Sequence, residues 1–123
     1  MLQVELNATD GVATLRPQEA LSEEDFTQAA RIIDPYIEKS GELKGLIIET
    51  ESFPGWDSFT SLLHHFQFIR EHHKKVSRIA FVTHSAIGNV AEKVGSHFVS
   101  AEIKHFGYDQ KTEALAWILT PAP

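Results

Sequence analysis

Residues 44–73 read KGLIIETESFPGWDSFTSLLHHFQFIREHH, and this stretch decides the fold. Gly45–Ile48 is a short apolar run with β-branched side chains, and a turn containing Pro54-Gly55 follows, so the run predicts a buried strand. A helix capped by Asp57 or Ser58 is predicted next, since apolar residues then recur every three or four positions. They are Phe59, Leu62, Leu63, Phe66 and Ile69. In parallel α/β sheets ligands meet the carboxyl ends of strands, so we expect any site in this loop.

Before this unit, the sequence predicts a hairpin and a helix. Leu2, Val4 and Leu6 alternate with polar residues, and Asp10-Gly11 turns the chain into a second strand at Val12–Leu15. Ser22-Glu23-Glu24-Asp25 is typical of a capping box that begins a helix. Its apolar face would hold Phe26, Ala30, Ile33 and Ile37. Pro35 predicts a kink or a break in this helix, and Ser40-Gly41 predicts its end.

After this unit, two strands and two helices are predicted. Arg78–Thr83 is a compact apolar strand, a helix begins near Ser85, and Ala101–Phe106 alternates as a further strand. Asp109 is the predicted cap of a last helix. The apolar residues of that helix are Ala114, Leu115, Trp117 and Ile118. The order β-β-α-β-α-β-α-β-α predicts an α/β domain of two or three layers, with a mostly parallel sheet and the first strand antiparallel.

Composition is that of an ordinary globular protein. The 123 residues are 42% hydrophobic and 23% charged, and we expect a single domain over residues 1–123. A net charge of −6 disfavours broad binding to nucleic acid or anionic membranes. There is no cysteine for a disulfide or a thiolate metal site. No apolar run reaches the ~20 residues of a membrane span and no leader is recognisable, so we expect a cytoplasmic protein.

Three segments carry a resemblance that covers most of the chain. They are Phe53-Pro54-Gly55-Trp56, Arg78–Val82 and Ala114-Leu115-Ala116-Trp117. With them the chain resembles the SpoIIAA-like family of small bacterial proteins, which is close to the STAS fold of sulphate-transporter tails and anti-sigma-factor antagonists. The resemblance implies a STAS-like fold and a module without established enzymatic activity.

The resemblance also implies a regulatory serine. In anti-sigma-factor antagonists a Ser preceded by Asp begins the helix after the third strand and is phosphorylated by a kinase partner, and Asp57-Ser58 stands at a similar place. A phosphate on Ser58 would gain the unpaired amides of the helix but would be repelled by Asp57, Glu51 and Glu49. The competing interpretation, which we favour, is that Asp57 or Ser58 is simply the N-cap.

Two groups of side chains are candidates for binding. Trp56, with Phe53, Phe59 and Ile87, would line a pocket for a small apolar ligand, although Trp56 packing onto its own helix is favoured. The other group is on the helix after residue 57, where Phe68 falls opposite the apolar face. Together with His64, His65 and His72, it would form a homodimer interface; the alternatives are a single exposed aromatic or cover by a neighbouring helix of the same chain. These histidines lack the i, i+4 spacing of a zinc site, so no metal is predicted.

No residue pattern assembles a catalytic site. Glu49 and Glu51 leave their strand on alternate sides and so do not form an acid–base pair. The glycines form no phosphate loop, and no cofactor is implied. The sequence therefore predicts a non-enzymatic binding or regulatory module for a partner protein or a small apolar ligand, near the loop after the third strand. The alternative is a phospho-switch at Ser58.

Overall fold

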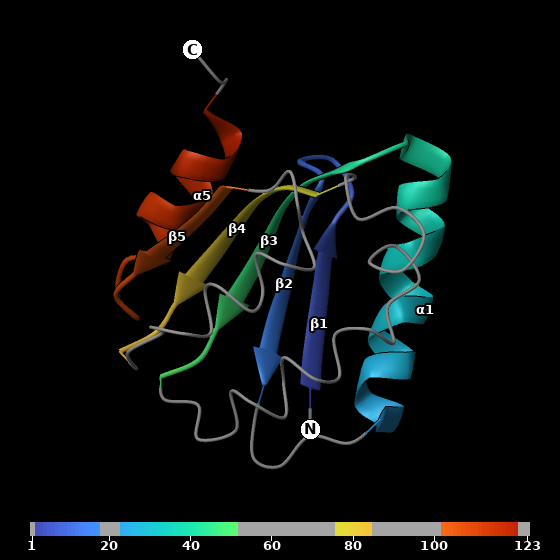
Figure 1. The fold of residues 1–123 in the computed structure, drawn as a ribbon, viewed down its shortest axis with the longest axis horizontal. Coiled ribbons are helices and arrows are strands. Elements are labelled where there is room, and N and C mark those ends of the chain that lie inside the picture. Colours follow the sequence, from blue (N-terminus) through green and yellow to red (C-terminus); the bar gives the residue numbers. More distant parts are fainter. Residues whose placement is uncertain (1, 18–22, 52–75, 85–101, 121–123) are drawn as a thin grey trace.

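The computed structural model describes residues 2–17, 23–51, 76–84 and 102–120. Within them the chain forms five strands and two helices (Figure 1). In chain order these are β1 (Leu2–Asn7), β2 (Val12–Pro17), α1 (Glu23–Ser40), β3 (Leu43–Glu49), β4 (Val76–Val82), β5 (Glu102–Phe106) and α5 (Lys111–Leu119). The helices predicted after residue 57 and near Ser85 lie outside the described residues.

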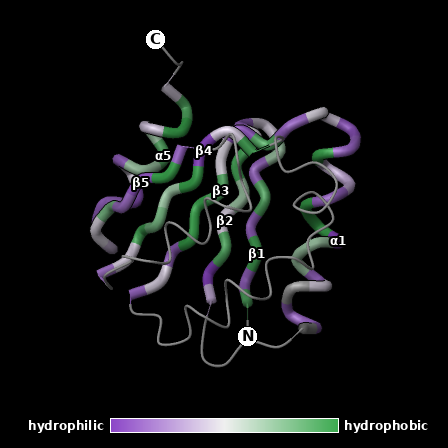
Figure 2. The backbone as a smooth tube through the Cα atoms, viewed as in Figure 1, coloured by the Kyte–Doolittle hydropathy of each residue, from purple (hydrophilic) through white to green (hydrophobic). Residues whose placement is uncertain are grey.

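The strands form one sheet in the order β1-β2-β3-β4-β5. β1 and β2 are an antiparallel hairpin, and every later pair is parallel. The side chains of β1 alternate between half-buried and exposed, whereas β3 and β4 are hydrophobic over most of their length (Figure 2). This is the pattern expected of an edge strand beside central strands that are covered on both faces. The predicted α/β fold with an antiparallel first strand is confirmed.

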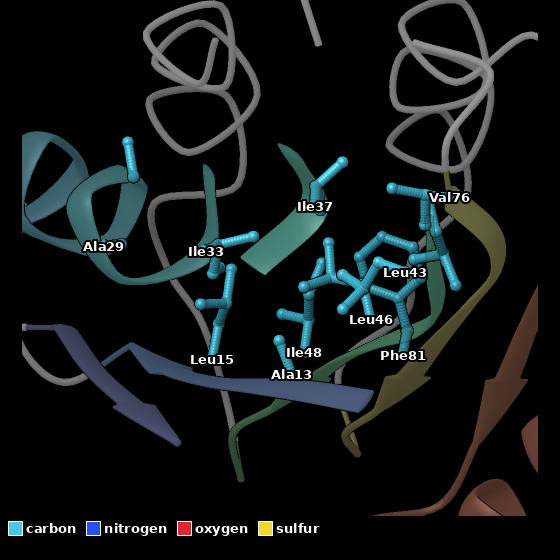
Figure 3. Packing of buried hydrophobic residues seen from close by; sticks show 12 residues of the cluster. Ala13, Leu15, Ala29, Ile33, Ile37, Leu43, Leu46, Ile48, Val76 and Phe81 are labelled. Carbon is cyan, nitrogen blue, oxygen red and sulfur yellow. The ribbon is translucent and has the colours of Figure 1, made fainter. Parts of the chain in front are cut away.

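Helix α1 covers one face of the sheet. Ile33 and Ile37 of the helix belong to one buried cluster with Leu15, Leu46 and Phe81 of the strands, and Figure 3 shows Ile33 next to Leu15. The same cluster takes in Ala13, Ala29, Ala30, Leu43, Ile48, Val76 and Ile79. Burying side chains of this size stabilises the fold by about 1.5–3 kcal/mol each, so this face holds the larger hydrophobic core among the described residues.

Of the kink or break predicted at Pro35, the break is wrong, because α1 runs from Glu23 to Ser40 with Pro35 inside it. Proline removes one helical hydrogen bond, but Ile33 and Ile37 on either side of it are both buried in the same cluster. Their burial keeps the two halves of the helix together. The predicted end at Ser40-Gly41 is confirmed: Gly41 has φ of 89°, and its N–H donates to the Ile37 carbonyl at 2.7 Å. Ser22 and the Phe26 side chain lie outside what the structure describes.

Helix α5 covers the opposite face, over β3, β4 and β5, so the described part of the domain has three layers. Its buried Ala114 and Ile118 pack on Val12, Ile47, Ala80, Val82 and Phe106. Gly45 allows the close approach, since a Cβ there would lie 2.3 Å from Cγ2 of Ile118. Within the described part of the chain, no helix is both long and apolar enough to span a membrane.

Asp109 is not the cap of α5, contrary to the sequence-based expectation. The helix begins at Lys111, and its N-cap is Gln110, whose side chain makes no capping hydrogen bond. Gly107 to Gln110 instead form a turn, which the Gln110 N–H closes on the Gly107 carbonyl at 2.9 Å. The Gln110 side-chain oxygen accepts from the Gly107 N–H at 2.8 Å. Asp109 therefore falls in the middle of the turn, one residue too early to cap the helix.

Candidate functional site

The carboxyl ends of β3, β4 and β5 meet at one edge of the sheet, which we call the carboxyl edge: residues 49–51, 82–84 and 106–108 (Figure 1). Backbone pairing continues past the strand ends. Thr50 N–H donates to the Val82 carbonyl at 3.0 Å, and Thr83 N–H donates to the Phe106 carbonyl at 3.0 Å. The described chain is thus held in place up to the points where residues 52–75 and 85–101 begin.

Thr83 is the most deeply buried polar side chain of this edge, with 0% of its surface exposed against 9% for Thr50. Its Oγ1 donates to the Glu51 carbonyl at 3.3 Å, and the same carbonyl accepts the His84 N–H at 3.2 Å. The Thr83 carbonyl lies 2.9 Å from Nε2 of His105. A carbonyl only accepts hydrogen bonds, so Nε2 carries the proton in this contact. These bonds join the ends of all three strands.

Three side chains project from this framework into solvent: Glu51, His84 and Tyr108. The rings of His84 and Tyr108 are 5.7 Å apart between centroids and tilted by 57°, a geometry typical of favourable ring contacts. They belong to neighbouring strand ends that are far apart in the sequence. The edge therefore presents a carboxylate, an imidazole and a phenol together.

Beside this surface lies a charge network on the face of α5. Glu49 Oε1 accepts from Nε of Arg16 at 2.6 Å and lies 3.5 Å from Nζ of Lys111, while Arg16 also contacts Glu5 at 2.8 Å. The hydrogen bond from Arg16, with its charge, lowers the pKa of Glu5 below its usual value. Partial burial acts to lower the pKa of Arg16, but its bonds to Glu49 and Glu5 outweigh this and raise it. Glu49 is therefore compensated by two cations.

The site residues predicted from the sequence lie outside the described residues. This holds for the candidate pocket (Phe53, Trp56, Phe59, Ile87), the candidate phosphorylation site (Ser58) and the candidate interface (His64, His65, Phe68, His72). Glu49 and Glu51 are described and differ, since Glu49 is ion-paired and Glu51 is exposed. Within the described ranges, no group of three or more His, Asp or Glu side chains is placed to hold a metal ion.

Sequence reasoning did not identify the contact between His84 and Tyr108 or the role of Thr83. All three residues lie at a predicted strand end or within two residues of one. This position was the signal that could have marked them as candidates. Their proximity depends on the parallel register of β4 and β5, which pairs Val82 with Phe106. Register between distant segments is not encoded in the local pattern of either segment.

Comparisons with known proteins place the chain in a family. A search of curated proteins and a search of solved structures each gave no significant match. Among family models, that of the SpoIIAA-like family matches residues 12–119, which takes in every described element except β1. The match agrees with the five-stranded sheet, the antiparallel first strand and the helices on the two faces. The chain belongs to the SpoIIAA-like family.

Proposed function

We propose that this protein is a non-enzymatic cytoplasmic binding module, a single domain that contacts a partner protein at its carboxyl edge. The family to which it belongs indicates a STAS-type regulatory or binding module and is generally non-enzymatic, and STAS-like domains commonly interact with proteins. The finer assignment to this edge is carried by one observation: Glu51, His84 and Tyr108 are exposed side by side on strand ends that backbone hydrogen bonds fix in place.

The chemistry of these side chains favours a protein partner. Tyrosine is enriched in protein interfaces because it supplies a large contact area with little conformational entropy to lose, while polar groups at the rim supply hydrogen bonds. Tyr108 is 39% exposed, its ring lies 5.7 Å from that of His84 between centroids, and Glu51 is exposed at the neighbouring strand end. A small apolar ligand held by Phe53, Trp56, Phe59 and Ile87 is the second outcome to test, since these residues follow the same two strand ends in the sequence.

A phospho-switch at Ser58 remains the alternative regulatory function, and one observation favours keeping it. Three carboxylates were expected to repel a phosphate in this region, namely Asp57, Glu51 and Glu49. Arg16 and Lys111 compensate Glu49. Part of the expected repulsion is thereby removed.

Native mass spectrometry of the untagged protein, purified gently from its own host, distinguishes these functions in one spectrum. We expect a complex with a different protein. A doubled mass would instead support the homodimer through His64, His65, Phe68 and His72, a small adduct the apolar ligand, and an added phosphate the switch at Ser58. A bare, unmodified monomer under conditions that preserve known weak complexes would contradict the proposal.

Two variants locate the contact. Tyr108→Ala removes the exposed ring from the carboxyl edge, and we expect it to reduce the fraction of protein in the complex. Ile32→Ala is the matched control, because Ile32 is a similarly exposed apolar side chain (45%) on α1. If both variants retain the complex equally, the partner binds elsewhere and the assignment to the carboxyl edge is wrong.

A further inference from the structure

The carboxyl edge contains one backbone acceptor that joins two strand ends. The Glu51 carbonyl receives both the His84 N–H, at 3.2 Å, and the Thr83 hydroxyl, at 3.3 Å. Glu51 is the last described residue before 52–75, and His84 is the last before 85–101. Together with the bond from the Thr50 N–H to the Val82 carbonyl, these two hydrogen bonds at a single oxygen fix the relative position of Glu51 and His84.

Thr83 is itself held from the side of β5. Its N–H donates to the Phe106 carbonyl at 3.0 Å, and its own carbonyl accepts Nε2 of His105 at 2.9 Å. Phe106 is partly fixed by the ring of Trp117 on α5, with centroids 5.9 Å apart. Through Thr83, the end of β3 is joined to β5, and Tyr108 is the second residue after β5.

We infer that Thr83 is a positioning residue: its hydroxyl sets the spacing of Glu51, His84 and Tyr108, and thereby the affinity for the partner. This inference rests on the proposed function, which places the contact at these three side chains. Thr83 does not touch the partner, because its side chain is fully buried. The hydroxyl is the group that holds the strand ends in position, since the methyl group of threonine neither donates nor accepts a hydrogen bond.

Two substitutions separate the hydroxyl from the shape of the side chain. Thr83→Val keeps the volume and removes the hydroxyl, whereas Thr83→Ser keeps the hydroxyl and removes the methyl group. Thr14→Val is the matched control, because Thr14 is also a buried threonine of the same sheet (6% exposed) but lies on β2. Hydrogen exchange of the His84 amide measures the strand-end geometry, and native mass spectrometry of the complex measures partner binding.

We expect Thr83→Val to speed exchange of the His84 amide by about two- to tenfold, the loss that one hydrogen bond of ordinary strength produces. Exchange of the Ile79 amide in the middle of β4 should not change. We expect partner affinity to fall by a similar factor of about two to ten, with the melting temperature within a few degrees of wild type. Thr83→Ser should restore both values, and Thr14→Val should change neither.

Equal behaviour of the valine and serine variants would overturn the inference, because the hydroxyl would then have no role of its own. An unchanged His84 exchange rate in Thr83→Val would overturn it as well. These outcomes differ from failure of the proposed function, in which the wild-type protein carries no partner. In that case the exchange measurement still decides whether Thr83 positions the edge.

Discussion

The two faces of the sheet are covered in different ways. On one face α1 buries large apolar side chains against β2, β3 and β4. On the other face the apolar cluster that α5 forms among the described residues is smaller, and polar contacts hold both ends of the helix. Lys111 at its start lies 3.5 Å from Glu49, and Arg78 donates to the carbonyls of Trp117 and Thr120 at its end.

This difference indicates a division of roles. Apolar burial is strong but non-directional, whereas hydrogen bonds and ion pairs are weaker but fix distances and angles. Of the two apolar clusters that the described residues form, the one on the face of α1 therefore contributes more to stability. The face of α5 positions the start of the helix, which begins three residues after Tyr108 of the carboxyl edge. Substitutions on the face of α1 should accordingly lower stability more than substitutions on the face of α5, which should mainly disturb the position of that helix.

The largest effect is expected for Ile33→Ala on the face of α1. Ile33 is fully buried, so the substitution loses transfer free energy and leaves a cavity, and unfolding should become easier by about 2–5 kcal/mol. Urea unfolding followed by circular dichroism measures it. Ile32→Ala, one residue away but exposed, should change the free energy of unfolding by no more than about 0.5 kcal/mol relative to wild type. Similar losses in both variants would contradict the assignment of the core.

A smaller loss of unfolding free energy is expected for Gly45→Ala, which lies beneath α5. The added Cβ would overlap Ile118, and overpacking of this kind costs about 1–3 kcal/mol. Ile118→Val in the same chain removes a methyl group and should recover part of the loss. A double-mutant cycle from urea unfolding gives the coupling between the two positions. Strictly additive effects would show that α5 does not approach β3 this closely.

Arg78→Met tests the polar contacts at the end of α5. The guanidinium lies over the Trp117 ring at 5.2 Å from its centroid, and it reaches the Thr120 carbonyl at 2.8 Å. Methionine keeps much of the volume and loses these contacts, so we expect the free energy of unfolding, measured with urea, to fall by about 1–1.5 kcal/mol. The loss stays this small because the freed carbonyls at the helix end become hydrated. Arg78→Lys should lose less, since it keeps the charge. An unchanged free energy of unfolding in Arg78→Met would show that these contacts do not stabilise the fold.

The smallest effect concerns pH and the exposed ion pair of Glu5 with Arg16. The pKa of Glu5 lies below its ordinary value of 4.5 in the folded protein. The stabilisation that this ion pair gives the folded protein is therefore complete above pH 4.5 and is lost as pH falls through the lowered pKa of Glu5. An NMR titration of the Glu5 carboxyl should show this, and Arg16→Gln should move the midpoint back toward 4.5. A midpoint already at 4.5 in the wild type would contradict the contact, as would a midpoint that high salt leaves unmoved.

Most of the described fold was predictable, because its strands have strong local signals. The alternation of Leu2, Val4 and Leu6 and the apolar run at Gly45–Ile48 both lie on strands as expected. The errors arose where tertiary contacts outweigh local preference. Burial of Ile33 and Ile37 keeps α1 continuous through Pro35, and the turn before α5 moves the cap from Asp109 to Gln110.

The candidate site was less predictable. The sequence indicated the loop after β3, and the structure describes that region up to Glu51. The pairing of His84 with Tyr108 depends on the register of β4 and β5, and the role of Thr83 depends on a carbonyl 32 residues away along the chain. Neither relation leaves a trace in the local pattern of apolar and polar residues.

The most direct test of the central claim is site-specific photo-crosslinking in the native host, with a photoreactive amino acid placed at Tyr108 in one strain and at Ile32 in another. Both positions are exposed, and they lie on different elements. If the carboxyl edge binds a partner protein, position 108 will give a discrete crosslinked species of higher mass and position 32 will not. Crosslinks from position 32 alone, or the same species from both positions, would contradict the account.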